Sequence, residues 1–167
     1  MGPGPSGKVC LVKTDLAELV ARHPLFAGLP ADLTAELAGC ARNVAFPAEG
    51  LLQVEGEAAD TLFLVRRGRV AIEVHAPGRG PLVIETVGPG GVVGWSWLIP
   101  PYRCQFDARA TEPVGAISVD VSCLRTKSEA DPAFGYALLQ RVSAMVVERL
   151  QKTRIRLLDL YASPETR

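Results

Sequence analysis

Between residues 44 and 120 the chain consists of short apolar segments that end at glycine or proline, and this limits the folds it can adopt. The segments are Val44–Phe46, Leu51–Val54, Thr61–Val65, Arg69–His75, Leu82–Val87, Phe106–Thr111 and Val114–Asp120, with Val92–Val93 as a candidate eighth. Parallel strands would need crossover helices, and no helical pattern separates these segments. The pattern therefore predicts a mainly β fold, a sandwich or barrel of antiparallel strands.

Helical patterns precede the predicted strands. Thr14 or Asp15 can cap a short helix that runs through about Arg22, where a following proline ends it. Pro30 opens a second helix, because proline suits the first helical turn. We therefore expect two short helices ahead of the strands.

The pattern becomes helical again after residue 120. One short helix covers 121–130, and Asp131 and Pro132 fit the cap and first position of a longer helix to about Tyr161. A mainly apolar stripe recurs along the longer helix every three or four residues, at Leu139, Val142, Val146, Leu150, Thr153, Leu157 and Leu160. About 28 helical residues extend roughly 42 Å, farther than a small barrel can cover. The stripe predicts a homodimer through this helix, and the alternative is a helix folded back on its own barrel.

These patterns divide the chain into four parts. They are a flexible N-terminus at 1–13, a β-roll domain with flanking short helices at 14–130, a long helix at 131–161 and a tail at 162–167. The short tail predicts a stand-alone module without a DNA-binding domain.

Charge and hydropathy argue against nucleic-acid and membrane partners. Eighteen basic residues balance eighteen acidic ones, so no net charge attracts phosphate backbones. No apolar run approaches the roughly 20 residues that span a bilayer. Residues 1–7 are rich in Gly, Pro and Ser and do not resemble a signal peptide. We expect a cytoplasmic protein.

Few residues offer metal or catalytic chemistry. Cys10, Cys40, Cys104 and Cys123 form no C-x-x-C pair; reduced thiols are the simpler interpretation for a cytosolic chain, with disulfide pairing left open. The two histidines form no H-x-H pair, and neither a G-x-S-x-G elbow nor a P-loop occurs. We therefore predict no metal site and no enzymatic activity.

Four local motifs follow one another in order along the chain. They are His23–Leu29, Phe46–Gly50, Glu55–Asp60 and Leu64–Val70. Together with the flanking helices they resemble the cyclic nucleotide-binding domain of the catabolite activator protein family. The resemblance covers about residues 14–161. It implies a double-stranded β-helix (jelly roll) with short N-terminal helices and a long C-terminal dimerisation helix.

In that family, a cassette between two late strands holds the cyclic phosphate and the ribose of the ligand. Backbone N–H groups at the start of a short helix face the anion, an arginine neutralises it, and a glutamate accepts the ribose hydroxyl. The corresponding stretch here is 88–107, whose glycines and short helix look preserved. Trp95 stands at the glutamate position, and its indole donates but cannot accept a hydrogen bond.

The arginine of the cassette is also displaced. Counting back from 110–113, which resembles the end of the family's next strand, places the arginine position at Cys104 and leaves Arg103 one residue early. In a strand, a shift of one residue moves a side chain to the opposite face, whereas slack in a loop can still aim Arg103 inward. We expect Asp107 to add a negative charge near the phosphate position.

Two interpretations of the pocket remain open. Either it binds cyclic AMP or cyclic GMP weakly or in an altered pose, or Trp95 and Trp97 fill or reshape it for another ligand or none. The candidate ligand-binding residues are Val93, Gly94, Trp95, Ser96, Trp97, Leu98, Arg103, Cys104, Gln105, Leu150, Thr153 and Arg154.

The last three candidates lie on the long helix. Leu150 and Thr153 match a family segment whose threonine reaches the purine base, and Arg154 replaces a second hydroxylated residue. Alternatively, Thr153 is a polar member of the dimer stripe.

The resemblance implies a sensor module whose pocket occupancy shifts the long helix and changes the surface shown to a separate protein partner. The alternatives are a structural or protein-interaction dimer with a plugged pocket, and a vestigial transcription regulator that lacks its helix-turn-helix.

Overall fold

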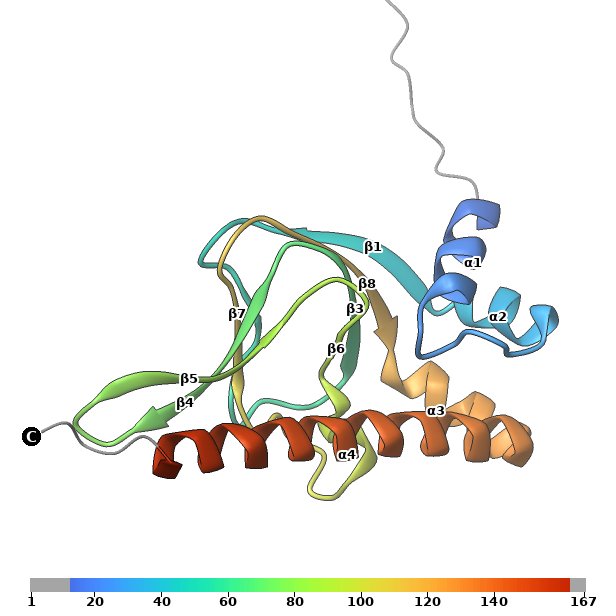
Figure 1. Ribbon diagram of the computed structural model, residues 1–167. Helices are drawn as coiled ribbons and strands as arrows, with labels where there is room; N and C mark the ends of the chain where they lie inside the picture. Colours follow the sequence, from blue (N-terminus) through green and yellow to red (C-terminus); the bar gives the residue numbers. More distant parts are fainter. Residues whose placement is uncertain (1–12, 163–167) are drawn as a thin grey trace, which may run out of the picture. The chain divides into compact units, whose positions relative to one another are not determined.

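The computed structural model describes residues 13–162, whose strands form two antiparallel sheets of four (Figure 1). The helices are α1 (Lys13–Arg22), α2 (Ala31–Ala38), the 3₁₀ helix η1 (Trp95–Leu98), α3 (Val121–Ala130) and α4 (Pro132–Ala162). The strands are β1 (Ala41–Phe46), β2 (Leu51–Gln53), β3 (Thr61–Arg67), β4 (Val70–Ala76), β5 (Gly80–Val87), β6 (Val92–Val93), β7 (Asp107–Ala110) and β8 (Val114–Asp120). Except for Lys13 and Ala162, the predicted flexible N-terminus and tail lie outside the described residues.

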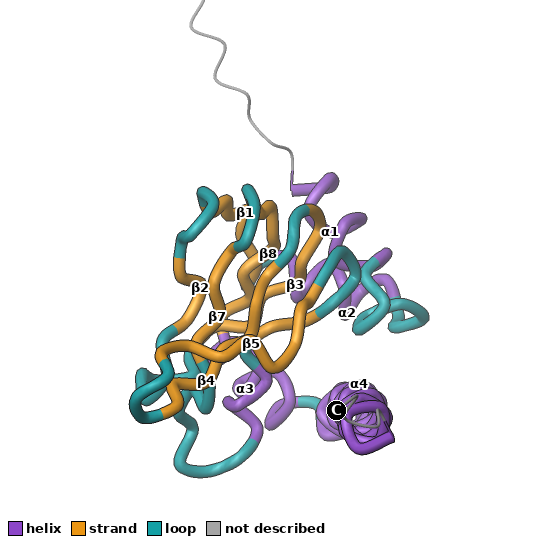
Figure 2. The backbone as a smooth tube through the Cα atoms, turned by 60° about the vertical axis from the view of Figure 1, so that its left-hand side comes forward, coloured by secondary structure: helices purple, strands orange, loops and turns teal. Residues whose placement is uncertain are grey.

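The two sheets share one core. Their strand orders are β1-β8-β3-β6 and β2-β7-β4-β5, and the strands of both sheets can be followed in Figure 2. Val65 and Ala116 of the first sheet pack in one apolar cluster with Ile72 and Ala108 of the second. Successive strand residues face opposite sides, so every second side chain enters this core. The arrangement confirms the predicted jelly roll.

Strand β1 begins at Ala41, three residues before the predicted Val44. Arg42 and Asn43 pair with Ser118 and Ile117 of β8. A β-ladder uses backbone groups, so polar residues extend the strand as well as apolar ones do. The sequence pattern missed this extension because it tracks apolar side chains.

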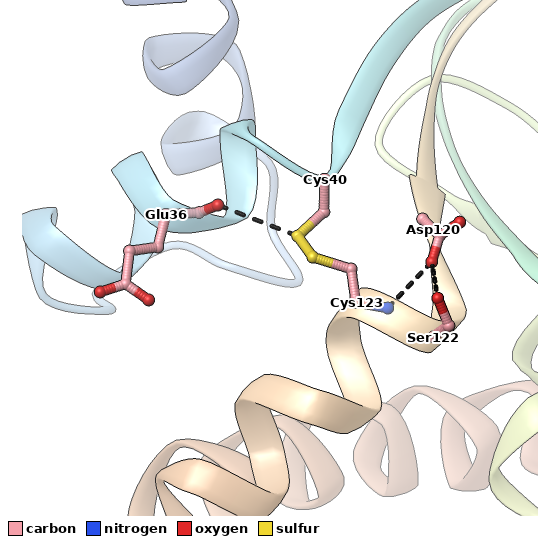
Figure 3. Close-up of a disulfide and its surroundings, with 5 residues drawn as sticks. All are labelled: Glu36, Cys40, Asp120, Ser122 and Cys123. Carbon is pink, nitrogen blue, oxygen red and sulfur yellow. Dashed lines mark hydrogen bonds between the residues drawn. A yellow bond between two sulfur atoms is a disulfide. The ribbon is translucent and has the colours of Figure 1, made fainter.

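Helix α3 follows β8 directly, and Asp120 caps its first turn. Its Oδ1 atom accepts hydrogen bonds from Ser122 Oγ at 2.5 Å and from the backbone N–H of Cys123 at 2.9 Å (Figure 3). The Ser122 hydroxyl, followed by the Cys123 amide, holds the pKa of Asp120 below its ordinary value. This cap fixes the position of Cys123 at the start of α3.

Cys123 forms a disulfide with Cys40, the residue before β1 (Figure 3). Their Cα atoms lie 5.9 Å apart, a usual spacing for a disulfide. The prediction of reduced thiols is therefore wrong for this pair. The two cysteines are 83 residues apart in sequence, and the pairing of Ala41 with Val119 brings them together.

The chain separates into two units, Met1–Leu124 with both sheets, and Arg125–Arg167 with the end of α3 and α4. The predicted cap of α4 is confirmed, because Asp131 Oδ1 accepts hydrogen bonds from the amides of Ala133 at 3.1 Å and Phe134 at 3.2 Å. Among the described residues, we find no helix with the length and hydropathy that crossing a membrane requires.

His23 is a buried base between α1 and α2, with 6% of its surface exposed. Its Nδ1 atom accepts a hydrogen bond from the amide of Leu25 at 3.2 Å, so the neutral ring carries its proton on Nε2. Burial lowers the pKa of His23 below its ordinary value, and the nearby Gly91 backbone partly opposes this shift. The unfolded chain therefore binds the proton more readily than the folded one.

Above about pH 6.5, we expect neutral His23 to make its full contribution to the free energy of unfolding. That contribution should fall as the pH drops from there through the lower pKa of folded His23. The loss is at most about 1.4 kcal/mol per pH unit. Urea unfolding at several pH values between about 7.5 and 5.5 measures this slope, and His23→Gln should flatten it. Equal slopes in the wild type and the variant would contradict this origin.

Candidate functional site

The candidate cassette begins where β6 ends and η1 starts. Gly94 has a φ of +90°, a conformation that L side chains rarely adopt. A Cβ atom on Gly94 would lie 2.5 Å from the carbonyl oxygen of Thr61 and 3.3 Å from Oε1 of Gln53. Only glycine fits this turn, which directs the chain from β6 into the short helix. Val93, the preceding candidate, is buried and pairs with Phe63 of β3.

The short helix η1 carries four of the candidate residues. Trp97 is 4% exposed and Ser96 is 6% exposed, whereas Trp95 and Leu98 are half-buried. The larger part of the Trp97 indole therefore occupies interior volume, and Trp95 keeps a face toward solvent. A short 3₁₀ helix confirms the helical element that the cassette motif predicts.

The segment after η1 is held against the loop between β2 and β3. Cys104 donates its amide to the Glu57 carbonyl at 2.9 Å, and its own carbonyl accepts the amide of Gly56 at 2.8 Å. The Tyr102 carbonyl accepts the amide of Ala59 at 2.9 Å. These bonds give residues 102–104 the geometry of a short antiparallel bridge, so their side chains alternate between faces.

Alternation separates Arg103 from Cys104. Cys104 is 6% exposed, whereas Arg103 is exposed and its Nη1 atom donates to the Gly56 carbonyl at 2.8 Å. The backbone bonds remove the loop slack that could have turned Arg103 inward. Gln105, the next candidate, is exposed.

Cys104 therefore occupies the inward position at which the resemblance implies an arginine. Burial raises the pKa of the Cys104 thiol, and the charges of Asp60 and Glu57 raise it further. Its Sγ atom lies 3.8 Å from the Ala58 carbonyl, which accepts the weak S–H hydrogen bond. The inward position carries a neutral thiol, not a cation.

Asp107 directs its carboxylate away from the apolar core between the sheets, and the expectation that its charge lies near a bound phosphate stays a prediction. Its neighbour Ala108 belongs to the core, so Asp107 faces the other side of β7. There Oδ1 accepts the amide of Glu55 at 2.6 Å, and Oδ2 lies 3.4 Å from Nδ1 of His75. The carboxylate fixes the start of the loop that precedes β3.

Sequence reasoning missed Gln53, the last residue of β2. Its Nε2 atom donates to the Phe106 carbonyl at 2.9 Å, which ties β2 to the end of the cassette. Within the part of the chain that the structure describes, its buried Oε1 atom has no hydrogen-bond partner, and it faces the Gly94 turn. No motif marks this residue, because its role depends on the pairing of β2 with β7.

The remaining candidates lie on α4, in the second unit. Leu150 and Thr153 are three residues apart and share a helix face. The Thr153 hydroxyl donates to the Arg149 carbonyl at 3.0 Å, within its own helix. A joint site of Leu150, Thr153 and Arg154 with the cassette stays a prediction.

No cluster of three or more His, Cys, Asp or Glu side chains that could hold a metal ion occurs among residues 13–162. The described cassette thus offers backbone amides, the two tryptophans, a neutral thiol and an amide oxygen.

Residues 43–131, 89 of the 167 residues, match the family model of the cyclic nucleotide-binding domain. The chain is similar to a CRP-like cAMP-activated global transcriptional regulator of Mycobacterium tuberculosis, at 28% identity over 143 residues. That match covers 86% of this chain and 62% of the regulator, so the chain spans less than two thirds of this relative.

Solved structures show the same fold. The N-terminal domain of a transcriptional regulator from Streptomyces coelicolor is 27% identical with a TM-score of 0.63, covering 81% of this chain and 94% of that domain. A cyclic nucleotide-binding domain from Methylobacillus flagellatus is 22% identical with a TM-score of 0.74, covering 93% and 86%. With its jelly roll, its cassette and the match over residues 43–131, the chain belongs to the cyclic nucleotide-binding domain family, of the catabolite activator protein type.

Proposed function

We propose that this chain is a non-catalytic regulatory module that binds a cyclic nucleotide weakly and passes the occupancy of its pocket to a separate protein partner. Family membership supports a regulatory cyclic nucleotide-binding domain, and the relative from Mycobacterium tuberculosis is cAMP-activated. Cyclic AMP and cyclic GMP are the ligands to test first. The ligand would favour one arrangement of the long helix over another, which any such switch requires.

The proposal of weak binding rests on which side chain faces inward: Cys104 is buried, whereas Arg103 is exposed. A guanidinium neutralises a phosphate through two parallel hydrogen bonds, which a protonated thiol cannot replace. Here the guanidinium is bonded to the Gly56 carbonyl, and the thiol is buried. We expect backbone amides at the start of η1 to face the anion, as the family resemblance implies, so affinity should be reduced but not abolished.

Gln53 supplies a second part of the proposed site. The family's glutamate position holds Trp95, which cannot accept a hydrogen bond. The unpartnered Oε1 atom of Gln53 beside the Gly94 turn offers an acceptor in its place. A ligand hydroxyl would satisfy this buried oxygen, which is costly to leave without a partner.

Cys104→Arg should tighten the binding of cyclic AMP by about tenfold or more. The variant places a cation at the inward position, and a charge-assisted hydrogen bond contributes roughly 1.5–3 kcal/mol. Calorimetry of the whole chain with cyclic AMP and cyclic GMP measures the change in affinity. The matched control variant, Gln105→Arg, adds the same charge at an exposed position of the same loop.

Gln105→Arg and Arg103→Ala should leave the affinity nearly unchanged. If Cys104→Arg and Gln105→Arg bind cyclic AMP with equal affinity, the inward position does not face the ligand and the proposal fails. Loss of binding in Arg103→Ala would show that the displaced arginine itself contacts the nucleotide.

We further propose that α4 forms a homodimer. The helix extends over 31 residues, about 46 Å at 1.5 Å per residue, and carries an apolar stripe through Val146, Leu150 and Leu157. Sedimentation equilibrium should give a dimer for the wild type and a monomer for the double variant Val146→Glu and Leu150→Glu. A wild-type monomer at about 50 μM, within the range of ordinary dimer affinities, would contradict the proposal.

A structural dimer with a plugged pocket is the second candidate, favoured by the burial of Trp97. It predicts that neither nucleotide binds the wild type or Cys104→Arg, and that Trp97→Ala, which empties the space of the indole, creates binding. Binding by Cys104→Arg with Trp97 intact would exclude it.

A further inference from the structure

A groove of about 500 Å³ lies on the first sheet, within the unit that holds both sheets. Its lining residues are Leu19 of α1, Asn43, Val44 and Ala45 of β1, Arg66 and Arg67 of β3, and Gly115 and Ala116 of β8. Val44 and Ala116 turn toward the core, so their neighbours Asn43, Ala45 and Gly115 face the outside of the sheet. The groove is therefore on the outer face, and it shares no residue with the cassette.

A β-bulge brings two successive arginines to this face. The register of β3 against β8 shifts between Val65 and Arg67, so that Arg66 is the extra residue. In a regular strand, one of two successive side chains would point into the core. The bulge changes the local twist and lets Arg66 and Arg67 line the same groove.

The side chain of Arg67 lies over Gly115. A Cβ atom on Gly115 would come within 2.6 Å of Arg67 Nε and 2.9 Å of its Cγ. The missing side chain at 115 thus gives the Arg67 stem its place on the sheet. Among residues 13–162, no side chain or backbone group forms a hydrogen bond or ion pair with the Arg67 guanidinium.

Arg66 and Asn43 complete a set of donors. Arg66 Nη1 donates to Oδ1 of Asn43 at 3.0 Å, which orients the amide and leaves Asn43 Nδ2 as a further donor. The eight lining residues that the structure describes include no carboxylate, and the charged groups among them are the two guanidinium groups of Arg66 and Arg67.

We propose that this groove is a second ligand site, which takes a carboxylate or phosphate group carried by a small molecule with a short apolar body. Guanidinium groups bind both oxyanions through paired hydrogen bonds. Leu19 and Ala45 provide the apolar contact, and the volume is within the range of small-molecule sites. The proposal does not depend on the function of the cassette.

NMR titration of the whole chain tests the site, with inorganic phosphate and hexanoate as separate probes at constant ionic strength. We expect saturable shifts of the Asn43 and Gly115 amide signals with at least one probe. Saturation by hexanoate alone assigns the site to a carboxylate, and saturation by phosphate alone assigns it to a phosphate. Constant ionic strength removes general screening of surface charge from the comparison.

Arg67→Ala and Arg66→Ala should each weaken binding tenfold or more. Gly115→Ala should weaken it as well, because the added Cβ displaces the Arg67 side chain. Arg69→Ala is the matched control, because Arg69 is an exposed arginine in the turn after β3 that does not line the groove. Circular dichroism verifies that each variant is folded.

Shifts that do not saturate with either probe, or a loss in Arg69→Ala equal to that in Arg67→Ala, would overturn the second site. Neither result bears on nucleotide binding at the cassette, which the Cys104→Arg experiment tests separately.

Discussion

Breaking the Cys40–Cys123 disulfide is expected to lower the free energy of unfolding by about 2–4 kcal/mol. The crosslink spans 83 residues, so it removes a large loop from the conformations open to the unfolded chain. It also ties the residue before β1 to the first turn of α3. Urea unfolding of the oxidised protein, with and without a dithiol reductant, measures the difference.

Cys123→Ser provides the control for this prediction. Its stability should match that of the reduced wild type, and the reductant should no longer change it. Cys104 is a free, buried thiol in the same protein. Equal unfolding midpoints of the oxidised and reduced wild type would show that the crosslink does not stabilise the fold.

Gly94→Ala is expected to destabilise the protein by about 3 kcal/mol or more and to weaken any ligand binding at the cassette. Two costs combine at this position. A positive φ costs a non-glycine residue roughly 1 kcal/mol or more. In addition, the new Cβ would lie 2.5 Å from the Thr61 carbonyl oxygen, so the turn between β6 and η1 would have to move.

Gly78→Ala separates these two costs. Gly78 has a φ of +77°, close to that of Gly94, and a Cβ there would meet no atom within 4 Å. It should therefore show the conformational cost alone, about 1 kcal/mol. If chemical denaturation gives the two variants equal free energies of unfolding, the close contact with Thr61 costs nothing. The turn at Gly94 would then move aside to accommodate the added Cβ atom.

Local patterns predicted most of the fold. The glycine and proline breaks located the strands, and Asp131 and Pro132 marked the start of α4, where the carboxylate caps two amides. These features depend on neighbouring residues in the chain, so sequence alone contains their physical cause. The starts of strands were less certain, as β1 shows, because backbone pairing continues past the last apolar residue.

The candidate site could be predicted in part. Spacing placed Cys104 at the inward position and Arg103 beside it, but two outcomes remained open for a flexible loop. The bonds of Cys104 to Glu57 and Gly56 decided between them, and these partners lie in another loop. Gln53 and the true partners of Asp107 were not predictable, because each depends on pairs between distant strands.

The sequence by itself determined the order of strands and helices, the family, and the tryptophan at the glutamate position of the cassette, whereas the outward orientation of Arg103 was decided by hydrogen bonds between two loops. Only the tertiary structure decided the Cys40–Cys123 crosslink and the groove of Arg66, Arg67 and Asn43. Periodicity and turn residues act over a few positions, so they are visible along the chain. Crosslinks and grooves need residues that only sheet register brings together, and register is set by the packing of the whole core.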